Sequence, residues 1–238
     1  KWSNCWSGTD NPVRYRDRVT TQGPDWHYKN KTITYETNRS GYRTQEWADI
    51  NWAESIVMIG DSITYGVGLA IDETLCTQLS ELTGRYVVSI GYPGGSNQVI
   101  LNNAAVLAEK FPTPYAVVTN WSSPDRFRYY AQENYHDIGV WNMPPDVYVV
   151  DDVNVSTLFR DTFVNRTNEM AINYYQGLAA RAIWAPRTRY AAISFFETTA
   201  RYVRADAFFR IDNQARDGYH PGPANCRQAA EFLAHALG

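Results

Sequence analysis

The sequence is poor in cysteine, in net charge and in long hydrophobic runs, and each shortage excludes a class of protein. Its three cysteines, Cys5, Cys76 and Cys226, are too few and too scattered for a disulfide framework or a zinc site. We expect three free thiols, with one disulfide as the alternative. A net charge of −3 provides no basic field for nucleic acid or anionic lipid. No apolar stretch approaches the roughly 18 residues of a membrane span, so we expect none.

Aromatic residues are abundant, at 14% of the 238 residues, and 44% of the chain is hydrophobic. This composition can build a sizeable core, and the length fits one domain with a short appendage. The chain begins at Lys1 instead of Met, which predicts a processed or trimmed product. Glycosylation triplets favour an extracellular location or one on a virion or cell envelope; they begin at Asn30, Asn38, Asn120, Asn154 and Asn165.

Residues 1–50 differ in composition from the rest of the chain. They are rich in Trp, Tyr, Arg, Asn and Thr, and they show little helical periodicity. Residues 31–37 alternate in the manner of a strand, and residues 38–41 are typical of a turn. We therefore predict an N-terminal arm (residues 1–50) with a hairpin, packed on a main domain of residues 51–238.

The main domain alternates short apolar strands with helical segments. Strands are predicted at 55–60, 86–91, 115–119 and 189–195, and helices at 72–83, 156–182 and about 224–237. A further helix, capped by Ser96 or Asn97, carries apolar residues from 99 to 108 and is closed by Pro112. Repeated strand–helix units predict an α/β fold, in which helices cover both faces of a mainly parallel sheet. Residues 127–155 break this rhythm. We interpret them as an irregular insertion, a feature that is usually functional or mobile.

A first candidate for chemistry is the segment Gly60-Asp61-Ser62, at the end of the first predicted strand. A residue in this position lies at the carboxyl edge of the sheet, where ligands of open α/β folds bind. If a helix follows, the Ser62 hydroxyl lies near free backbone N–H groups that can stabilise a developing oxyanion. The alternative is an ordinary strand-ending turn with a capping serine.

A second candidate is Asp217-Gly-Tyr-His220, just before the last predicted helix. An activated serine requires a base, and the base requires a group that orients it. His220 can take the proton of Ser62, and Asp217 can hold the imidazole in the correct tautomer. Pro221 and Gly222 make the segment a fixed turn. Taken alone, the segment is equally consistent with a surface turn.

Together these segments resemble the conserved blocks of the SGNH (GDSL-type) hydrolases. Gly60-Asp61-Ser62-Ile63 is similar to the opening block, and Asp217-Gly-Tyr-His220-Pro is similar to the closing one. Residues 90–97 resemble the second block, which implies that the backbone N–H of Gly94 donates to the oxyanion. The third block departs from the family pattern of Gly-x-Asn-Asp. Either Asn120 or Ser122 is therefore expected as the remaining oxyanion donor.

The resemblance implies a flavodoxin-like fold and a serine esterase with the triad Ser62, Asp217 and His220. It implies no metal and no organic cofactor. The expected substrate is a small acyl ester, most simply an acetyl ester on a polysaccharide. Three alternatives stay open: a lipase or thioesterase, an acyltransferase to sugars, and a weak or inactive glycan-binding or structural module of a larger assembly such as a virion. Homo-oligomers are compatible with each alternative.

Other residues have weaker claims to function. Arg126 and Arg128 follow the third strand and suit either an anionic substrate group or a salt bridge at the rim of the site. An aromatic wall for sugar stacking, or ordinary packing, is expected from Tyr129, Tyr130, Tyr135, Trp141 and Tyr148. Asp151 and Asp152 suit either a bound cation or a solvated loop. His27, His136 and His235 have no carboxylate or cysteine at metal-ligand spacing. For these we expect surface or packing roles.

The arm carries one further, looser similarity. Residues 38–43 resemble a segment that precedes the catalytic domain in some bacterial and phage-borne members of the family.

Overall fold

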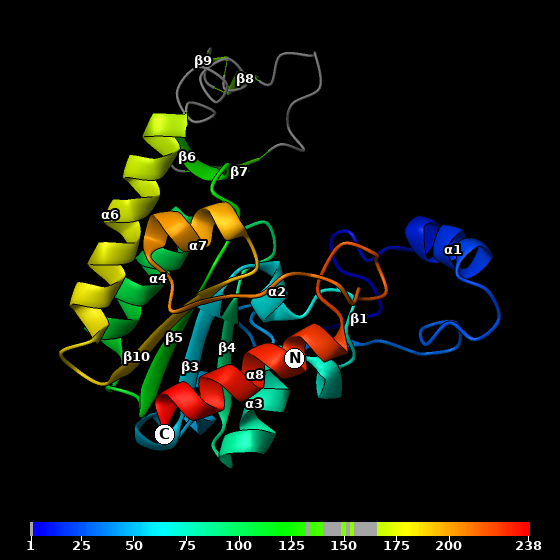
Figure 1. The fold of residues 1–238 in the computed structure, drawn as a ribbon, viewed down its shortest axis with the longest axis horizontal. Coiled ribbons are helices and arrows are strands. Elements are labelled where there is room, and N and C mark those ends of the chain that lie inside the picture. Colours follow the sequence, from blue (N-terminus) through cyan, green and yellow to red (C-terminus); the bar gives the residue numbers. More distant parts are fainter. Residues whose placement is uncertain (1, 132–133, 140–148, 151–152, 155–165) are drawn as a thin grey trace.

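A five-stranded parallel sheet forms the centre of the computed structural model, which describes residues 2–131, 134–139, 149–150, 153–154 and 166–238 (Figure 1). The strands are β3 (Ile56–Gly60), β4 (Val87–Gly91), β5 (Ala116–Trp121), β10 (Arg189–Ser194) and β11 (Ala207–Phe208). Their order across the sheet is β11-β10-β5-β3-β4. Every pair of neighbours in this sheet is parallel.

Helices cover both faces of this sheet. On one face lie α2 (Ser62–Tyr65), α3 (Leu75–Thr83) and α8 (Pro223–Leu237), and on the other lie α4 (Asn97–Lys110), α6 (Arg166–Trp184) and α7 (Glu197–Val203) (Figure 1). Short 3-10 helices occur at Trp47–Asp49, Trp52–Glu54 and Ile71–Glu73. The predicted three-layer α/β/α architecture is therefore confirmed.

The sheet is apolar on both faces because helices pack against each of them. On β3, Ile56 and Met58 belong to one hydrophobic cluster, whereas Val57 and Ile59 belong to the other. All four side chains are fully buried. Alternate residues of a strand point to opposite faces, so a continuous apolar run is what a doubly covered strand requires.

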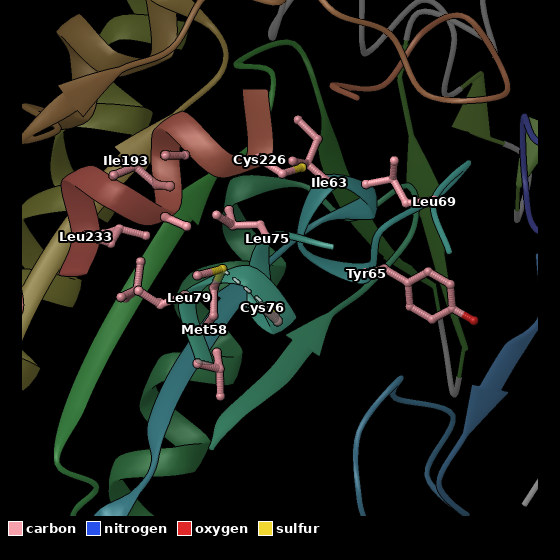
Figure 2. Close-up of a cluster of buried hydrophobic side chains, with 14 of the residues drawn as sticks. Met58, Ile63, Tyr65, Leu69, Leu75, Cys76, Leu79, Ile193, Cys226 and Leu233 are labelled. Atoms are coloured by element: carbon pink, nitrogen blue, oxygen red, sulfur yellow. Dashed lines mark hydrogen bonds between the residues drawn. The ribbon is translucent and has the colours of Figure 1, made fainter. Parts of the chain in front are cut away.

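One of these clusters joins β3 to α3 and α8. Figure 2 shows Met58 of β3, Cys76 and Leu79 of α3 and Leu233 of α8 gathered together. The Sγ atom of Cys76 lies 3.8 Å from the Met58 sulfur. Burial raises the pKa of the Cys76 thiol to about 12, so the thiol is neutral at physiological pH. Cys5, Cys76 and Cys226 are all free thiols, as the sequence predicted.

The strand order fixes where a ligand site can form. Counted along the chain, the five strands of the sheet lie in the order 2-1-3-4-5, which is that of flavodoxin-like folds. The connection leaving the first strand, β3, runs to one side of it, and the connection leaving β4 crosses to the other. In such sheets the crevice at this switch point, beyond the carboxyl ends of the strands, is the usual ligand site.

The N-terminal arm contains β1 (Trp2–Asn4), α1 (Pro12–Thr21) and β2 (Tyr35–Thr37). The turn predicted at residues 38–41 is present, but β2 pairs antiparallel with β1, so the expected partner within a local hairpin was wrong. Helix α1 was not predicted. It lies at one edge of the molecule and has no buried residue, so it lacks the apolar periodicity that would reveal it (Figure 1).

The insertion is more regular than the sequence predicted. Strands β6 (Phe127–Ala131) and β7 (Asn134–Ile138) form an antiparallel pair, and β8 (Val149–Val150) pairs with β9 (Val153–Asn154). The prediction of an irregular segment was therefore wrong for these strands. Of the helix predicted at 156–182, residues 156–165 lie outside the described part of the chain, and α6 covers the rest.

Core packing between α3 and α8 should contribute strongly to stability. Replacing the fully buried Leu79 by Ala is expected to lower the free energy of unfolding by about 2–5 kcal/mol, through lost transfer energy and a residual cavity. Urea denaturation monitored by tryptophan fluorescence measures this. Leu82 lies on the same helix and is 36% exposed, so Leu82→Ala should change stability by less than about 1 kcal/mol. Equal losses in both variants would contradict the packing described.

Candidate active site

Ser62 is the first residue of α2, directly beyond the carboxyl end of β3. Asp61 caps this helix, because its Oδ1 accepts the backbone N–H of Ile63 at 2.9 Å. The turn from strand to helix is tight. A Cβ atom at Gly60 would lie 2.1 Å from the Thr64 hydroxyl oxygen, so only glycine fits there. The sequence therefore places the serine hydroxyl at a helix N-terminus on the edge of the sheet.

Ser62, His220 and Asp217 form a continuous hydrogen-bonded chain. The Nε2 atom of His220 lies 2.7 Å from Ser62 Oγ, and its Nδ1 lies 2.6 Å from Asp217 Oδ2. The other carboxylate oxygen of Asp217 accepts the backbone N–H groups of Tyr219 and His220, at 3.0 and 3.2 Å. The structure thus brings together three side chains from opposite ends of the main domain, in the arrangement of a serine nucleophile, a base and an orienting acid.

The environment of Asp217 keeps its carboxyl group ionised. Burial alone would raise its pKa, but hydrogen bonding and charge attraction from His220, together with a hydrogen bond from Thr9, outweigh burial and lower the pKa to about 2. An ionised carboxylate beside Nδ1 favours the tautomer with its proton on that nitrogen. The lone pair of Nε2 is then directed at the Ser62 hydroxyl.

The backbone N–H groups of Ser62 and Gly94 both follow strands of the sheet at its carboxyl edge. That of Ser62 belongs to the first turn of α2, where backbone donors precede the first intrahelical bond, from Tyr65 to Asp61. Gly94 follows β4 in a turn closed by a bond from the Gly95 N–H to the Tyr92 carbonyl. Its φ of +81° is a backbone conformation that favours glycine. These loops follow neighbouring strands, so both lie at the same edge of the sheet.

The structure engages the side chains of Asn120 and Ser122 elsewhere. Asn120 is fully buried, and its amide donates to the Thr64 hydroxyl at 3.1 Å. Ser122, also fully buried, donates its hydroxyl proton to Asp61 Oδ2 at 2.7 Å, and Arg126 donates to both of these groups. In this arrangement the Ser122 hydroxyl proton and one N–H of the Asn120 amide are engaged within the protein.

Asn97, from the segment that resembles the second SGNH block, holds the segment around Ser122 in place. Asn97 accepts the backbone N–H of Ser122 at 2.7 Å and donates to its carbonyl at 3.1 Å. This reciprocal pair fixes the loop after β5 to the start of α4. The sequence indicates an asparagine at the start of this helix, next to the predicted site. It does not indicate the partner of this asparagine, which lies 25 residues away.

The sequence analysis also missed three residues that contact Asp217 or its neighbour in the chain. Thr9, in the N-terminal arm, donates to Asp217 Oδ2 at 2.5 Å. Asp10 forms a buried ion pair with Arg216, the residue that precedes Asp217. Because these contacts join positions more than 200 residues apart, no local pattern predicted them.

Aromatic side chains on the β6–β7 hairpin lie partly at the surface. Tyr130 and Tyr135 are cross-strand partners, 57% and 49% exposed. Tyr129 is half-buried on β6. Arg128 makes a bidentate ion pair with Asp137, so the salt bridge expected as its alternative role is present. The predicted wall members Trp141 and Tyr148 lie outside the described residues.

No group of three His, Cys, Asp or Glu side chains is close enough to hold a metal ion among the described residues. His27 instead contacts Glu73 at 2.5 Å, and His235 is exposed on α8. The side chain of His136 and residues 151–152 fall outside the described structure. Within the ranges that are described, every helix is too short or too polar to cross a lipid bilayer.

Comparison with known proteins finds similarity in structure only. No family model matches the sequence, and no curated protein matches it. A lipolytic protein of the G-D-S-L family from Desulfitobacterium hafniense aligns over 77% of this chain and 99% of its own, with 14% identity and a TM-score of 0.41. Proteins of the type that the sequence blocks resemble are thus among the similar structures.

Two carbohydrate esterases are also similar to this chain. An acetyl xylan esterase from Butyrivibrio proteoclasticus aligns over 79% of this chain and 64% of its own, with 13% identity and a TM-score of 0.46. A family two carbohydrate esterase from Clostridium thermocellum, solved with cellohexaose, aligns over 76% and 62%, with 13% identity and a TM-score of 0.45. This chain spans less than two thirds of either enzyme, so its chemistry has to be derived from its own residues.

Acid should destabilise the protein partly through Asp217. Its pKa is about 2 when folded, against an ordinary value of 3.8, so the unfolded chain binds the proton first as the pH falls. The stability that the ionised carboxylate contributes is present above about pH 4 and is lost toward about pH 2. Urea denaturation at a series of pH values should show a shallower acid loss in Asp217→Asn than in wild type. The exposed Asp25→Asn should behave as wild type, and an unchanged slope in Asp217→Asn would refute this assignment.

Proposed function

We propose that the protein is a serine esterase that works through an acyl-enzyme. The observation that carries this proposal is the chain from Ser62 Oγ to His220 Nε2 at 2.7 Å and from His220 Nδ1 to Asp217 Oδ2 at 2.6 Å. It lies at the carboxyl edge of the sheet, next to the switch point in strand order. Nucleophile, base and orienting group are therefore within hydrogen-bonding reach in a place where ligands bind.

The proposed reaction has two halves. Ser62 Oγ attacks the ester carbonyl carbon while its proton passes to His220 Nε2, and the backbone N–H groups of Ser62 and Gly94 stabilise the oxyanion. Collapse of this intermediate breaks the bond to the alcohol, which leaves with the proton from His220. Water then gives a proton to His220 and attacks the acyl-enzyme, and Ser62 regains its proton as the acid departs.

The proposed oxyanion hole has two backbone donors and no side-chain donor from the third block. Ser122 directs its proton to Asp61, and Asn120 is buried against Thr64. Loss of one oxyanion donor typically reduces kcat by about 10²–10³-fold. We therefore expect slower turnover than a three-donor enzyme of the same type would show.

For the substrate we propose a small acyl ester, an acetyl group, carried on a carbohydrate. Exposed tyrosines support a sugar ligand, because their rings offer apolar faces with a polar tip. Tyr219 is 61% exposed and lies between the two triad residues Asp217 and His220, while Tyr130 and Tyr135 are exposed on the hairpin after β5. An extracellular or surface location and membership of a larger assembly stay predictions.

Removing the nucleophile should abolish turnover. We expect Ser62→Ala to lower kcat for p-nitrophenyl acetate by at least about 10³-fold, because the triad acts as a unit. A fluorophosphonate probe should label wild type and leave Ser62→Ala unlabelled. The exposed Ser3→Ala serves as the matched control and should behave as wild type. If folded wild type is neither labelled by the probe nor able to hydrolyse the ester, the esterase proposal is contradicted, and the glycan-binding or structural module is favoured.

The length of the acyl chain tests the substrate class. Along a series of p-nitrophenyl esters from acetate to octanoate, we expect kcat/KM to fall by about tenfold or more, because a site that fits an acetyl group does not accommodate further methylenes. Release of acetate from acetylated xylan provides the carbohydrate test. A rise in kcat/KM with chain length would favour the lipase or thioesterase. Preferential formation of sugar acetates when acceptor sugars are added would favour the transferase.

A further inference from the structure

Two consecutive residues of the N-terminal arm contact two consecutive residues of the loop that carries Asp217 and His220, here called the catalytic loop. Thr9 contacts Asp217, and Asp10 contacts Arg216. One contact is a hydrogen bond to the triad carboxylate, and the other is an ion pair directly beside it. The arm therefore meets the site at its acid, on the side opposite the nucleophile.

The Thr9 hydroxyl lies against the bond between His220 and Asp217. Its oxygen is 2.5 Å from Asp217 Oδ2 and 3.5 Å from His220 Nδ1. A hydroxyl has a single proton, and the ionised carboxylate oxygen can only accept, so Thr9 is the donor. Asp217 Oδ2 thus accepts from both Thr9 and His220, while Oδ1 accepts two backbone N–H groups. Each oxygen of the Asp217 carboxylate therefore accepts two hydrogen bonds, which fix the orientation of the group.

The turn that carries Thr9 is itself rigid. Ser7 and Asp10 exchange two backbone hydrogen bonds of 3.0 Å, and Gly8 between them has a φ of +58°. This is the geometry of a two-residue hairpin turn, in which glycine at the first central position supplies the positive φ. Thr9 occupies the second central position, so its hydroxyl is held at the tip of the turn.

A buried ion pair anchors this turn to the catalytic loop. Arg216 donates through Nε to Asp10 Oδ1 at 2.8 Å and through Nη2 to Oδ2 at 2.6 Å, and the two side chains are 4% and 1% exposed. The Tyr35 hydroxyl donates to Asp10 Oδ2 at 2.5 Å and accepts the Gly68 N–H at 2.8 Å. A bidentate, desolvated pair of this kind fixes both distance and orientation.

We propose that Thr9 is a positioning residue of the active site, and that the N-terminal arm completes the catalytic machinery. The inference rests on the proposed esterase function. Through its hydroxyl, Thr9 holds the plane of the Asp217 carboxylate and thereby the ring of His220. Thr9 acts on the triad without contacting the reacting atoms, so its removal affects the rate of the chemical step more than substrate binding.

The test compares Thr9→Val, which keeps the shape and removes the hydroxyl, with Thr9→Ser, which keeps the hydroxyl. Thr9→Val is expected to lower kcat for p-nitrophenyl acetate by about tenfold or more with KM unchanged, since small misplacements of catalytic groups cost up to about 10²-fold. Thr9→Ser should stay within about threefold of wild type. The low-field proton resonance of His220 Nδ1, recorded without substrate, should move in Thr9→Val and stay in place in Thr9→Ser.

Several results would overturn the inference. If Thr9→Val keeps the wild-type kcat and the wild-type resonance while Ser62→Ala is inactive, Thr9 has no positioning role and the esterase proposal stands. If Thr9→Val and Thr9→Ser lose activity equally, the hydroxyl is not responsible. If wild type and Ser62→Ala are equally inactive, the proposed function fails, and the resonance alone still decides whether Thr9 positions His220. Should Thr9→Val not fold, Thr9→Ala replaces it in each comparison.

Discussion

The parallel sheet is the constraint on which the site depends. Five strands that run in one direction send every following loop to the same edge, so residues 62, 94 and 122 meet there although they follow three different strands. Burial on both faces holds the strands in register, because sliding a strand by one residue would exchange the side chains that meet the two hydrophobic clusters. The position of Ser62 at this edge therefore depends on the core beneath the sheet.

The proposed acid and base, Asp217 and His220, lie outside the sheet. Asp217 and His220 lie on a loop before α8. The N-terminal arm holds this loop through the Asp10–Arg216 ion pair, and the main domain holds it through the bond from the Arg216 N–H to the Gly68 carbonyl. Breaking a buried ion pair such as Asp10–Arg216 by removing one partner typically costs about 3–5 kcal/mol, since the remaining charge stays buried without compensation. The arm also contributes Tyr28, Ile33 and Tyr35 to the hydrophobic core. These residues of the arm are therefore part of the folded core.

Physical reasons separate what the sequence could predict from what it could not. The strands and helices of the sheet region carry strong apolar patterns. Residues 60–62 lie at the end of one such strand, and residues 217–220 lie just before the last helix. Helix α1 lacks a buried face and the β6–β7 hairpin lies outside the main sheet, so neither has that signal. The bond from Thr9 to Asp217 depends on tertiary folding alone, because the two residues are 208 positions apart. A motif gives the identity of a catalytic group, whereas its supports are set by the whole fold.

The departure in the third block has an explanation in the burial of Asp61. Its carboxylate is 1% exposed, and one oxygen caps α2 while the other requires donors of its own. Ser122 and Arg126 supply them, at 2.7 and 3.1 Å. An uncompensated buried charge would destabilise the turn that presents Ser62. Here the loop after β5 stabilises Asp61, the cap of α2, and the Ser122 hydroxyl is engaged within the protein. In the proposed esterase, the turn that presents Ser62 is thus stabilised by the side chain of Ser122, which is not proposed as an oxyanion donor.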